Sequence, residues 1–161
     1  MNDLLHDAAL TMSETSTIAN SPSTESRTQP ESEHIVFFDG VCGLCNHTVD
    51  FLLRSDVAGL MKFAPLQGST AANLLPEDVR VRLDTMAYYR GGQVYYRSAA
   101  VVRFLRDLHG FWGIAGLLLW VIPGPLRDVA YRCVSAMRYR LFGKHEACRI
   151  PTPAERSRFL D

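Results

Sequence analysis

The sequence predicts an α/β fold in which helices cover both faces of a sheet, with a helical extension at the C-terminal end. Three observations support this prediction: a buried-strand pattern at 34–39, helical spacing from residue 42 onward, and an aromatic hairpin pattern at 85–98. The chain has 161 residues, of which 47% are hydrophobic, and this suits one globular domain with a sizeable core.

The N-terminal stretch differs in composition from the rest of the chain. Residues 11–33 are rich in Ser, Thr and Glu and contain few side chains that a core could bury. We therefore expect residues 1–33 to form a disordered tail, followed by one domain at 34–161. Within that domain the core is expected at about 34–110 and the helical extension at about 111–161.

The first elements of the domain are predicted from short local patterns. The segment "HIVFFD" at 34–39 combines β-branched and aromatic residues and runs into an Asp-Gly step, as a buried strand does. Apolar residues then recur at helical spacing, which predicts an amphipathic helix over 42–55. Its apolar positions are Cys42, Cys45, Val49, Leu52 and Leu53. A second strand is predicted at 60–66, and "STAANLL" predicts a short helix closed by Pro76.

A β-hairpin is predicted where Gly91 and Gly92 separate two aromatic-rich segments. A two-residue turn places three pairs opposite each other: Tyr89 and Val94, Tyr88 and Tyr95, Ala87 and Tyr96. Because apolar side chains then meet on both faces of the hairpin, we expect it to lie inside a covered sheet.

Two helices are predicted after the hairpin. Ser98 is expected to cap the first, which buries Val101, Leu105 and Leu108 and ends at Gly110. The second is expected at 126–142. The side chains expected to face inward from it are Val129 or Ala130, Cys133, Met137 and Leu141. The side chains expected on its outer face are Arg127, Arg132, Arg138 and Arg140.

The order of these elements narrows the fold. A strand, a helix and a strand come first, and a short helix, a hairpin and another helix follow them. This is the core arrangement of a thioredoxin-like fold, an α/β sheet with helices on both faces. The prediction does not use the cysteines.

The longest apolar stretch, "FWGIAGLLLWVI" at 111–122, is twelve residues long. A helix needs about 20 residues to span a bilayer, so no transmembrane segment is expected. We expect the stretch to pack into the core, because residues 117–120 leave no consistent polar face. Peripheral contact with a membrane is the less favoured alternative.

Charge and cysteine content limit the classes of function. Lys plus Arg and Asp plus Glu number 17 each, so the net charge is zero and no nucleic-acid partner is expected. Residues 97–161 hold eleven bases and five acids, which predicts a basic face in the C-terminal part. The four cysteines are too few for a disulfide scaffold, and the N-terminus lacks a cationic region followed by an apolar stretch. We therefore expect a cytoplasmic protein.

The chemistry is expected at Cys42 and Cys45, at the junction between strand and helix. There the Cys42 sulfur would face unpaired backbone N–H groups and the positive end of the helix dipole, which favour the thiolate. Cys45, one turn later, is about 5–6 Å away and within reach of a disulfide. We expect an exposed Cys42 to attack a protein or small-molecule disulfide, and a shielded Cys45 to resolve the mixed disulfide. A separate electron donor would reopen the Cys42–Cys45 bond, and no cofactor is expected.

Asp39 lies three residues before Cys42, at the end of the predicted strand. If it is partly buried, its pKa would rise, and it could accept the proton of Cys45. It could equally cap the helix or form an Asx turn with Gly40. Spacing alone leaves both roles open, and one carboxylate could serve both.

The segment "FFDGVCGLC" resembles the D-x-x-C-x-x-C motif of the DCC family of predicted thiol-disulfide oxidoreductases. The likeness continues through "DFLLRSD", "MKFAPLQ", the hairpin, "RSAAVVRFL", "VIPGPLRDVAYRCV" and "RYRLFGKHEACRIPTPAERSRF", and so covers about 34–160. The resemblance implies a thioredoxin-like fold and protein-disulfide reductase activity, with Asp39, Cys42 and Cys45 at the site. Gly43 and Leu44 stand where thioredoxins carry Gly-Pro, so the redox potential is not carried over.

Two other functions compete with redox exchange. Cys42, Cys45, His145 and Cys148 would complete a tetrahedral zinc site. Structural zinc sites usually hold small loops together, whereas these two pairs lie about a hundred residues apart, so redox exchange is favoured. A non-catalytic module would instead use the apolar 111–122 segment and the Arg-rich helix to bind a membrane or a partner.

Overall fold

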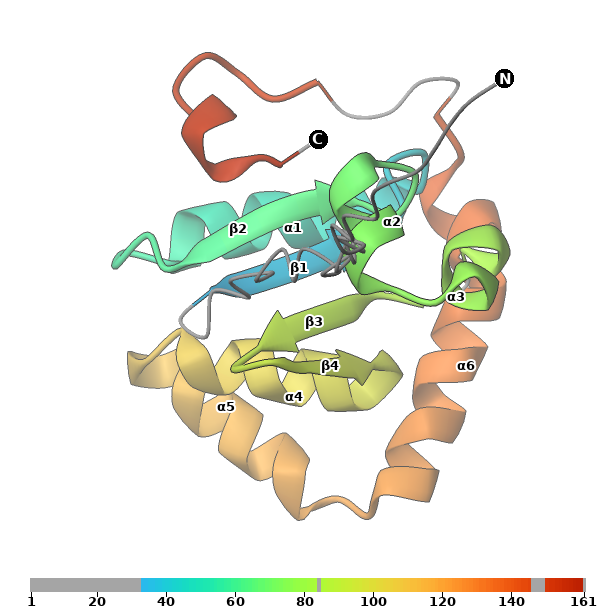
Figure 1. Ribbon diagram of the computed structural model, residues 1–161. Coiled ribbons are helices and arrows are strands. Elements are labelled where there is room, and N and C mark those ends of the chain that lie inside the picture. Colours follow the sequence, from blue (N-terminus) through green and yellow to red (C-terminus); the bar gives the residue numbers. More distant parts are fainter. Residues whose placement is uncertain (1–32, 84, 146–149, 161) are drawn as a thin grey trace, which may run out of the picture.

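The computed structural model describes residues 33–83, 85–145 and 150–160, and in this part of the chain the core is a four-stranded sheet (Figure 1). The strands are β1 (His34–Phe38), β2 (Met61–Pro65), β3 (Ala87–Arg90) and β4 (Gln93–Tyr96). Their order across the sheet is β2-β1-β3-β4. The disordered tail predicted at 1–33 lies, except for its last residue, outside the described residues.

Strand pairing gives the sheet a mixed direction. β1 and β2 are parallel, with His34 opposite Met61, whereas β1 with β3 and β3 with β4 are antiparallel. The hairpin register is the predicted one, including Tyr89 opposite Val94. A parallel pair joined by a helix and followed by an antiparallel hairpin is the thioredoxin-like order, so the predicted fold class is confirmed.

Alternate strand residues build two hydrophobic clusters, one on each face of the sheet. From β1, Val36 and Phe38 point into one cluster, and Ile35 and Phe37 point into the other. This alternation explains why the four residues of β1 that follow His34 are all apolar: they are buried on both faces of the sheet.

Helices cover both faces, as predicted (Figure 1). The first cluster is closed by α1 (Gly43–Ser55) and α4 (Arg97–Asp107). The second is closed by α2 (Ser69–Leu74) and α3 (Glu77–Arg82). Helix α3 was not predicted, because its six residues, all of them described, include no buried side chain and so show no apolar period.

The start and end of α4 differ from the prediction. Tyr96 is its N-cap, whereas Ser98 lies inside the helix, is buried, and donates a hydrogen bond to Asp128. The residues buried from α4 include Ala100 and Phe104, while Val101 and Leu105 are only partly buried. The helix ends at Asp107, and Gly110 begins the next helix instead of terminating this one.

The prediction that residues 111–122 pack into the core is wrong. All but the last of them, the C-cap residue Ile122, lie in α5 (Gly110–Val121), all of whose residues are described and in which Gly116 alone is buried. Gly116 faces α4 so closely that a Cβ there would lie 2.8 Å from the backbone nitrogen of Arg106. The helix therefore packs against α4 through a glycine and against Phe51 of α1 through Trp112, and most of its large apolar side chains are exposed.

Helix α6 (Gly124–Phe142) is turned the opposite way from the prediction. Cys133, Met137 and Leu141 are exposed, whereas Arg138 is buried. The inward stripe is polar, because α6 does not lie on a face of the sheet but packs against α1 and α4, where backbone groups and carboxylates need partners. The inward side chains are Arg127, Tyr131, Ser135 and Arg138.

The C-terminal segment crosses the free edge of β2. The Leu160 N–H donates to the Phe63 carbonyl at 2.8 Å, and the Phe159 ring packs on the Phe63 ring. Arg158 forms an ion pair with the buried Asp56 carboxylate, which also accepts the Met61 N–H at 2.8 Å. This segment blocks an edge that could otherwise pair with another chain.

Among the described residues, no single helix is long and apolar enough to cross a membrane. Helices α5 and α6 pass the same test only when taken together, and they meet at a bend of 112°.

Arg158→Met is expected to lower the free energy of unfolding by about 2–4 kcal/mol, because it leaves the buried Asp56 carboxylate without its cation. Urea unfolding followed by circular dichroism measures the loss. Arg156→Met changes an exposed arginine two residues earlier and should cost less than about 0.5 kcal/mol. Equal losses in the two variants would show that the ion pair does not hold the C-terminal segment.

Candidate functional site

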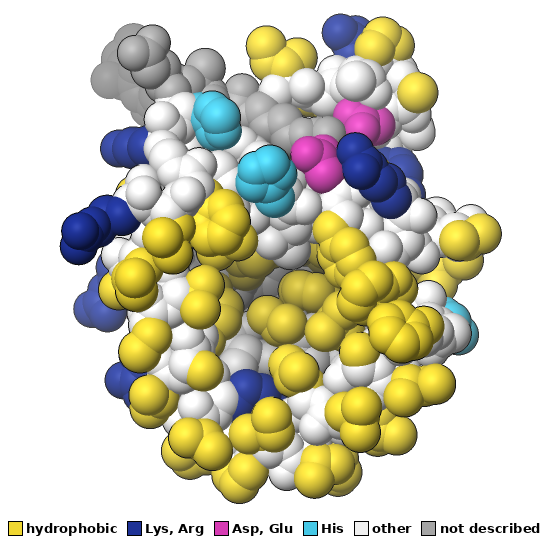
Figure 2. All heavy atoms as spheres, turned by 180° about the vertical axis from the view of Figure 1, so that it is seen from behind, with side chains coloured by type: hydrophobic (Ala, Val, Ile, Leu, Met, Phe, Trp, Pro, Cys, Tyr) yellow, Lys and Arg dark blue, Asp and Glu magenta, His cyan; other side chains and the backbone are white. Residues whose placement is uncertain are grey.

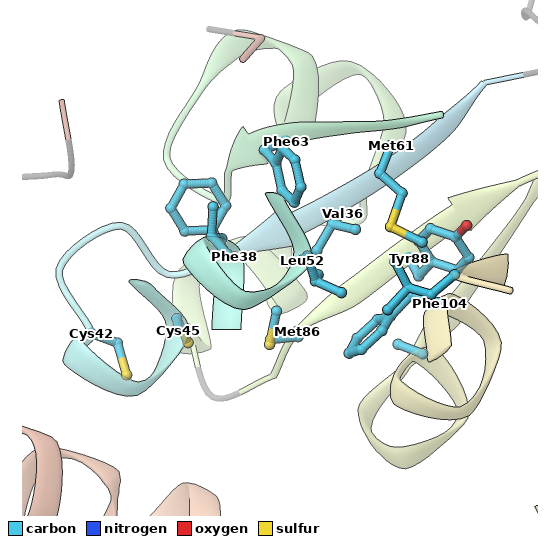
Figure 3. Close-up of a cluster of buried hydrophobic side chains, with 13 residues drawn as sticks. Val36, Phe38, Cys42, Cys45, Leu52, Met61, Phe63, Met86, Tyr88 and Phe104 are labelled. Atoms are coloured by element: carbon cyan, nitrogen blue, oxygen red, sulfur yellow. The ribbon is translucent and has the colours of Figure 1, made fainter. Parts of the chain in front are cut away.

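The two cysteines lie where β1 passes into α1. Cys42 is the N-cap residue of α1, and Cys45 follows in the first turn. Figure 3 shows both side chains at one end of the hydrophobic cluster that β1, α1 and α4 share. Both are free thiols in the structure, so it represents the reduced form of the pair.

Cys42 is covered by the segment that follows α6. Lys144 pairs with Cys42 in an antiparallel β-bridge, and the His145 N–H donates to the Val41 carbonyl at 2.8 Å. As a result Cys42 is 0% exposed, and Cys45 is 6% exposed. The expectation of an exposed Cys42 was therefore wrong, because local spacing cannot reveal a covering segment from far along the chain.

Gly43 allows this close cover. A Cβ at Gly43 would lie 2.1 Å from the backbone oxygen of Phe142, at the end of α6. The Gly43 N–H donates to the Gly143 carbonyl at 3.3 Å. Any side chain at this position would push the end of α6 away, so glycine is required by packing.

The pKa of Cys42 is lowered from its ordinary value to about 6. The main cause is a hydrogen bond from the Cys45 thiol, to which the Cys45 backbone N–H and the positive charge of Arg138 add. Burial and the negative charge of Asp39 oppose the shift. In the reduced protein Cys42 is therefore mainly a thiolate at neutral pH.

The pKa of Cys45 moves in the opposite direction. Its thiol donates a hydrogen bond to the Cys42 sulfur, and this bond, burial and the negative charge of Cys42 all raise the pKa. A backbone hydrogen bond from Asp39 opposes them. The pair therefore holds one proton, on Cys45, and one negative charge, on Cys42.

Asp39 is buried and holds the loop before Cys42. Its carboxylate accepts the Val41 N–H at 3.2 Å, which is an Asx turn, and the Gln67 amide at 3.1 Å. Tyr139 donates to it at 2.7 Å. The side chain does not cap α1, because the cap has no side-chain hydrogen bond.

Sequence reasoning missed Arg138, the cation of the site. Its guanidinium lies 3.9 Å from the Asp39 carboxylate and donates to the Leu83 carbonyl at 2.6 Å. It also donates to Tyr139, whose own pKa is raised chiefly by burial. One signal could have revealed it: Arg127, Tyr131, Ser135 and Arg138 recur at helical intervals, which marks a polar face that could turn inward.

A cavity of about 700 Å³ lies beside Cys45, bounded by α1, α4, α5 and α6. Its walls are mainly apolar, and Figure 2 shows hydrophobic side chains around a hollow on this side of the molecule. Arg138 also lines it, and the buried Nε of Arg138 has no hydrogen-bond partner among the described residues. The two sulfurs therefore have different surroundings: a peptide segment covers Cys42, and an apolar space adjoins Cys45.

The structure describes three of the four residues of the hypothetical zinc site: Cys42, Cys45 and His145. The backbone of His145 lies beside the loop that carries Cys42, but Cys148 lies outside the described residues. In the part of the chain that is described, no group of three or more His, Cys, Asp or Glu side chains could hold a metal ion.

Two curated proteins are similar to the chain over most of its length. The uncharacterized protein YuxK of Bacillus subtilis is 38% identical over 131 residues, which are 78% of this chain and 93% of that protein. A DCC family protein of Arabidopsis thaliana, whose name marks it as chloroplastic, is 28% identical over 129 residues, 79% of this chain and 75% of that protein. No solved structure matches the chain.

The family comparison covers both the cysteine loop and the helices that enclose it. The model of the DCC1-like thiol-disulfide oxidoreductases matches residues 36–144, from β1 through the segment that covers Cys42. The CxxC pair, its position at the start of α1 and the thioredoxin-like order of the sheet agree with this match. The chain therefore belongs to the DCC1-like thiol-disulfide oxidoreductase family.

Proposed function

We propose that the protein is a cytoplasmic thiol-disulfide oxidoreductase of the protein-disulfide reductase type, in which Cys42 is the nucleophile and Cys45 the resolving thiol. The observation that carries the proposal is the geometry of the pair at the start of α1, where the Cys45 thiol donates a hydrogen bond to the Cys42 sulfur. This contact lowers the pKa of Cys42 to about 6 and raises that of Cys45. Thiol-disulfide exchange needs one thiolate to attack the substrate and a second thiol that stays protonated until the mixed disulfide has formed, and the pair supplies both.

In the first step the Cys42 thiolate attacks one sulfur of the substrate disulfide. A bond forms between Cys42 and that sulfur, the substrate disulfide breaks, and the other substrate sulfur leaves as a thiolate. Negative charge moves away from Cys42, so the hydrogen bond to its sulfur and its negative charge no longer raise the pKa of Cys45.

In the second step Cys45 loses its proton and attacks the Cys42 sulfur. The Cys42–Cys45 disulfide forms, the mixed disulfide breaks, and the second substrate sulfur leaves as a thiolate. The substrate has gained two electrons and the pair has lost two. A dithiol reductant then returns two electrons to the pair and one proton to Cys45, and its second proton goes to solvent.

Asp39 is the proposed acceptor of the Cys45 proton. It is buried, it lies in the loop before Cys42, and its charge raises the pKa of Cys45. Its carboxylate also holds Tyr139 and Arg138, so the same group fixes the cation that stabilises the Cys42 thiolate. The two roles of Asp39, accepting a proton and positioning Arg138, can be separated by how the rate of substrate release depends on pH.

Trapping tests the assigned roles directly. In a Cys133→Ser/Cys148→Ser background, which removes the exposed Cys133 thiol, the Cys45→Ser variant should accumulate a mixed disulfide on Cys42. The Cys42→Ser variant should accumulate none, because Cys45 is buried, and burial alone still raises its pKa without the Cys42 sulfur. Intact-mass spectrometry after mixing with an oxidised substrate measures both. Equal trapping by the two variants, or by neither, contradicts the roles.

The rate of Cys42 alkylation by iodoacetamide should rise with pH and level off above a midpoint near the Cys42 pKa of about 6. Arg138→Gln removes a positive charge that favours the thiolate, so the midpoint should move to higher pH. Arg140→Gln, an exposed arginine on the same helix, is the control and should leave the midpoint unchanged. A midpoint that does not move in Arg138→Gln would exclude Arg138 as a source of thiolate stabilisation.

Asp39→Asn should slow the release of substrate from a preformed mixed disulfide by about a hundredfold at neutral pH, the usual size of a general-base contribution. The deficit should shrink as pH rises, because hydroxide replaces the missing base. Stopped-flow measurement of product thiol across pH gives both quantities. Gln67→Ala, which removes another partner of the same loop, should give a smaller deficit that does not depend on pH. A pH-independent deficit in Asp39→Asn would assign Asp39 to positioning alone.

A further inference from the structure

The surface formed by α5 and α6 is more apolar than the rest of the protein (Figure 2). Of the nineteen large hydrophobic side chains that are exposed in the described residues, fifteen lie between residues 110 and 142. The most exposed side chains of α5 include Phe111, Ile114, Leu118, Trp120 and Val121. A continuous apolar surface of this kind marks a site of interaction with a membrane or a partner.

Helix α5 is apolar around its whole circumference. Its glycine side packs against α4, and the Trp112 ring packs on the Phe51 ring of α1, with centroids 4.6 Å apart. Its other large side chains are mostly more than half exposed among the described residues: Phe111, Ile114, Leu117, Leu118, Trp120 and Val121. A helix that is hydrophobic on all sides is stable where its surroundings are apolar. The described part of this chain does not supply such surroundings to the exposed side of α5.

The charges on this surface all have one sign. Arg132 and Arg140 are exposed on α6, and Lys144 follows the helix. The sole acid between 110 and 142, Asp128, is half-buried and accepts a hydrogen bond from Ser98. Cations among apolar side chains complement an anionic partner, whereas a second copy of this surface would bring like charges together.

The length of α5 and its bend against α6 suit binding at the surface of a membrane better than crossing it. Helix α5 has 12 residues, about 18 Å of helix, whereas the hydrocarbon core of a bilayer is about 30 Å thick. The 112° bend between α5 and α6 also prevents the two from forming one straight span. Trp112 and Trp120 belong to the residue type that collects at the level of lipid headgroups.

We propose that α5 and α6 form a surface that binds the headgroup region of an anionic lipid bilayer. The apolar side chains of α5 enter the boundary between headgroups and acyl chains, and Arg132, Arg140 and Lys144 contact lipid phosphates. The protein binds as a peripheral, reversible membrane protein. The proposal uses no cysteine and stands independently of the redox function.

Sedimentation of the full chain with vesicles tests the proposal. The protein should bind vesicles of equimolar phosphatidylglycerol and phosphatidylcholine, bind phosphatidylcholine vesicles weakly, and lose affinity as salt is added. Leu118→Glu/Val121→Glu should weaken binding at least about tenfold, because it places two charges in the apolar layer.

A matched control separates this surface from general apolar exposure. Val57→Glu/Val81→Glu changes residues that are 95% and 71% exposed, against 66% and 71% for Leu118 and Val121. The control variant should bind vesicles as the unmodified protein does. Circular dichroism establishes that both variants are folded.

The cations are tested in the same assay. Arg132→Gln and Arg140→Gln should each weaken binding to anionic vesicles about fivefold, the effect expected of one basic residue near an anionic surface. Arg54→Gln, an exposed arginine on α1, should have no effect.

Three results would overturn the proposal. The first is no binding to anionic vesicles, and the second is equal loss of binding in the Leu118/Val121 and Val57/Val81 variants. The third is a stable dimer, measured by light scattering, that ignores vesicles and is abolished by Leu118→Glu/Val121→Glu; this would assign the surface to a second copy of the chain.

Discussion

One buried cation, Arg138, joins α6 to the loop that carries Asp39 and leads into Cys42. A buried guanidinium is unfavourable unless acceptors and negative charge surround it, and here the Asp39 carboxylate, the Leu83 carbonyl and Tyr139 do so. These contacts fix the last turn of α6, and this turn places residues 143–145 over Cys42. The same positive charge lowers the pKa of Cys42. Arg138 therefore contributes to packing and cover at the site and adds to the stabilisation of the Cys42 thiolate.

The parts of the fold that were predictable from sequence are those in which local pattern and tertiary surroundings agree. β1 is buried on both faces and α1 on one, so an apolar run and an apolar stripe identified them. The hairpin register followed from its two-residue turn. Asp39, Cys42 and Cys45 lie together because they share one short loop and the helix start that follows it. Local spacing suffices for such contacts.

The C-terminal helices were mispredicted for a physical reason that the two share. Both were assigned by the rule that apolar side chains face inward, but α5 exposes them and α6 buries Arg138 in place of Met137. In α6 the polar and apolar stripes have the same period, and what selects the polar one is the set of partners on other elements, such as Asp39 and the Met86 N–H. Those partners are far away in sequence, and periodicity carries no information about them.

Residues 143–145 cover Cys42, so the rate at which this thiolate reacts depends on access to its sulfur as well as on its pKa. A reagent that cannot displace the 143–145 segment reacts only during the fraction of time in which the segment is open, so its rate falls by that fraction. Hydrogen peroxide is such a reagent, and oxidation of Cys42 to sulfinic or sulfonic acid is slowed accordingly. Under the proposed function, a polypeptide substrate that replaced the β-bridge with its own backbone would open the site as it bound. Under the proposed function, the cover would therefore favour a disulfide carried on an extended chain over a small diffusing oxidant before any bond is made.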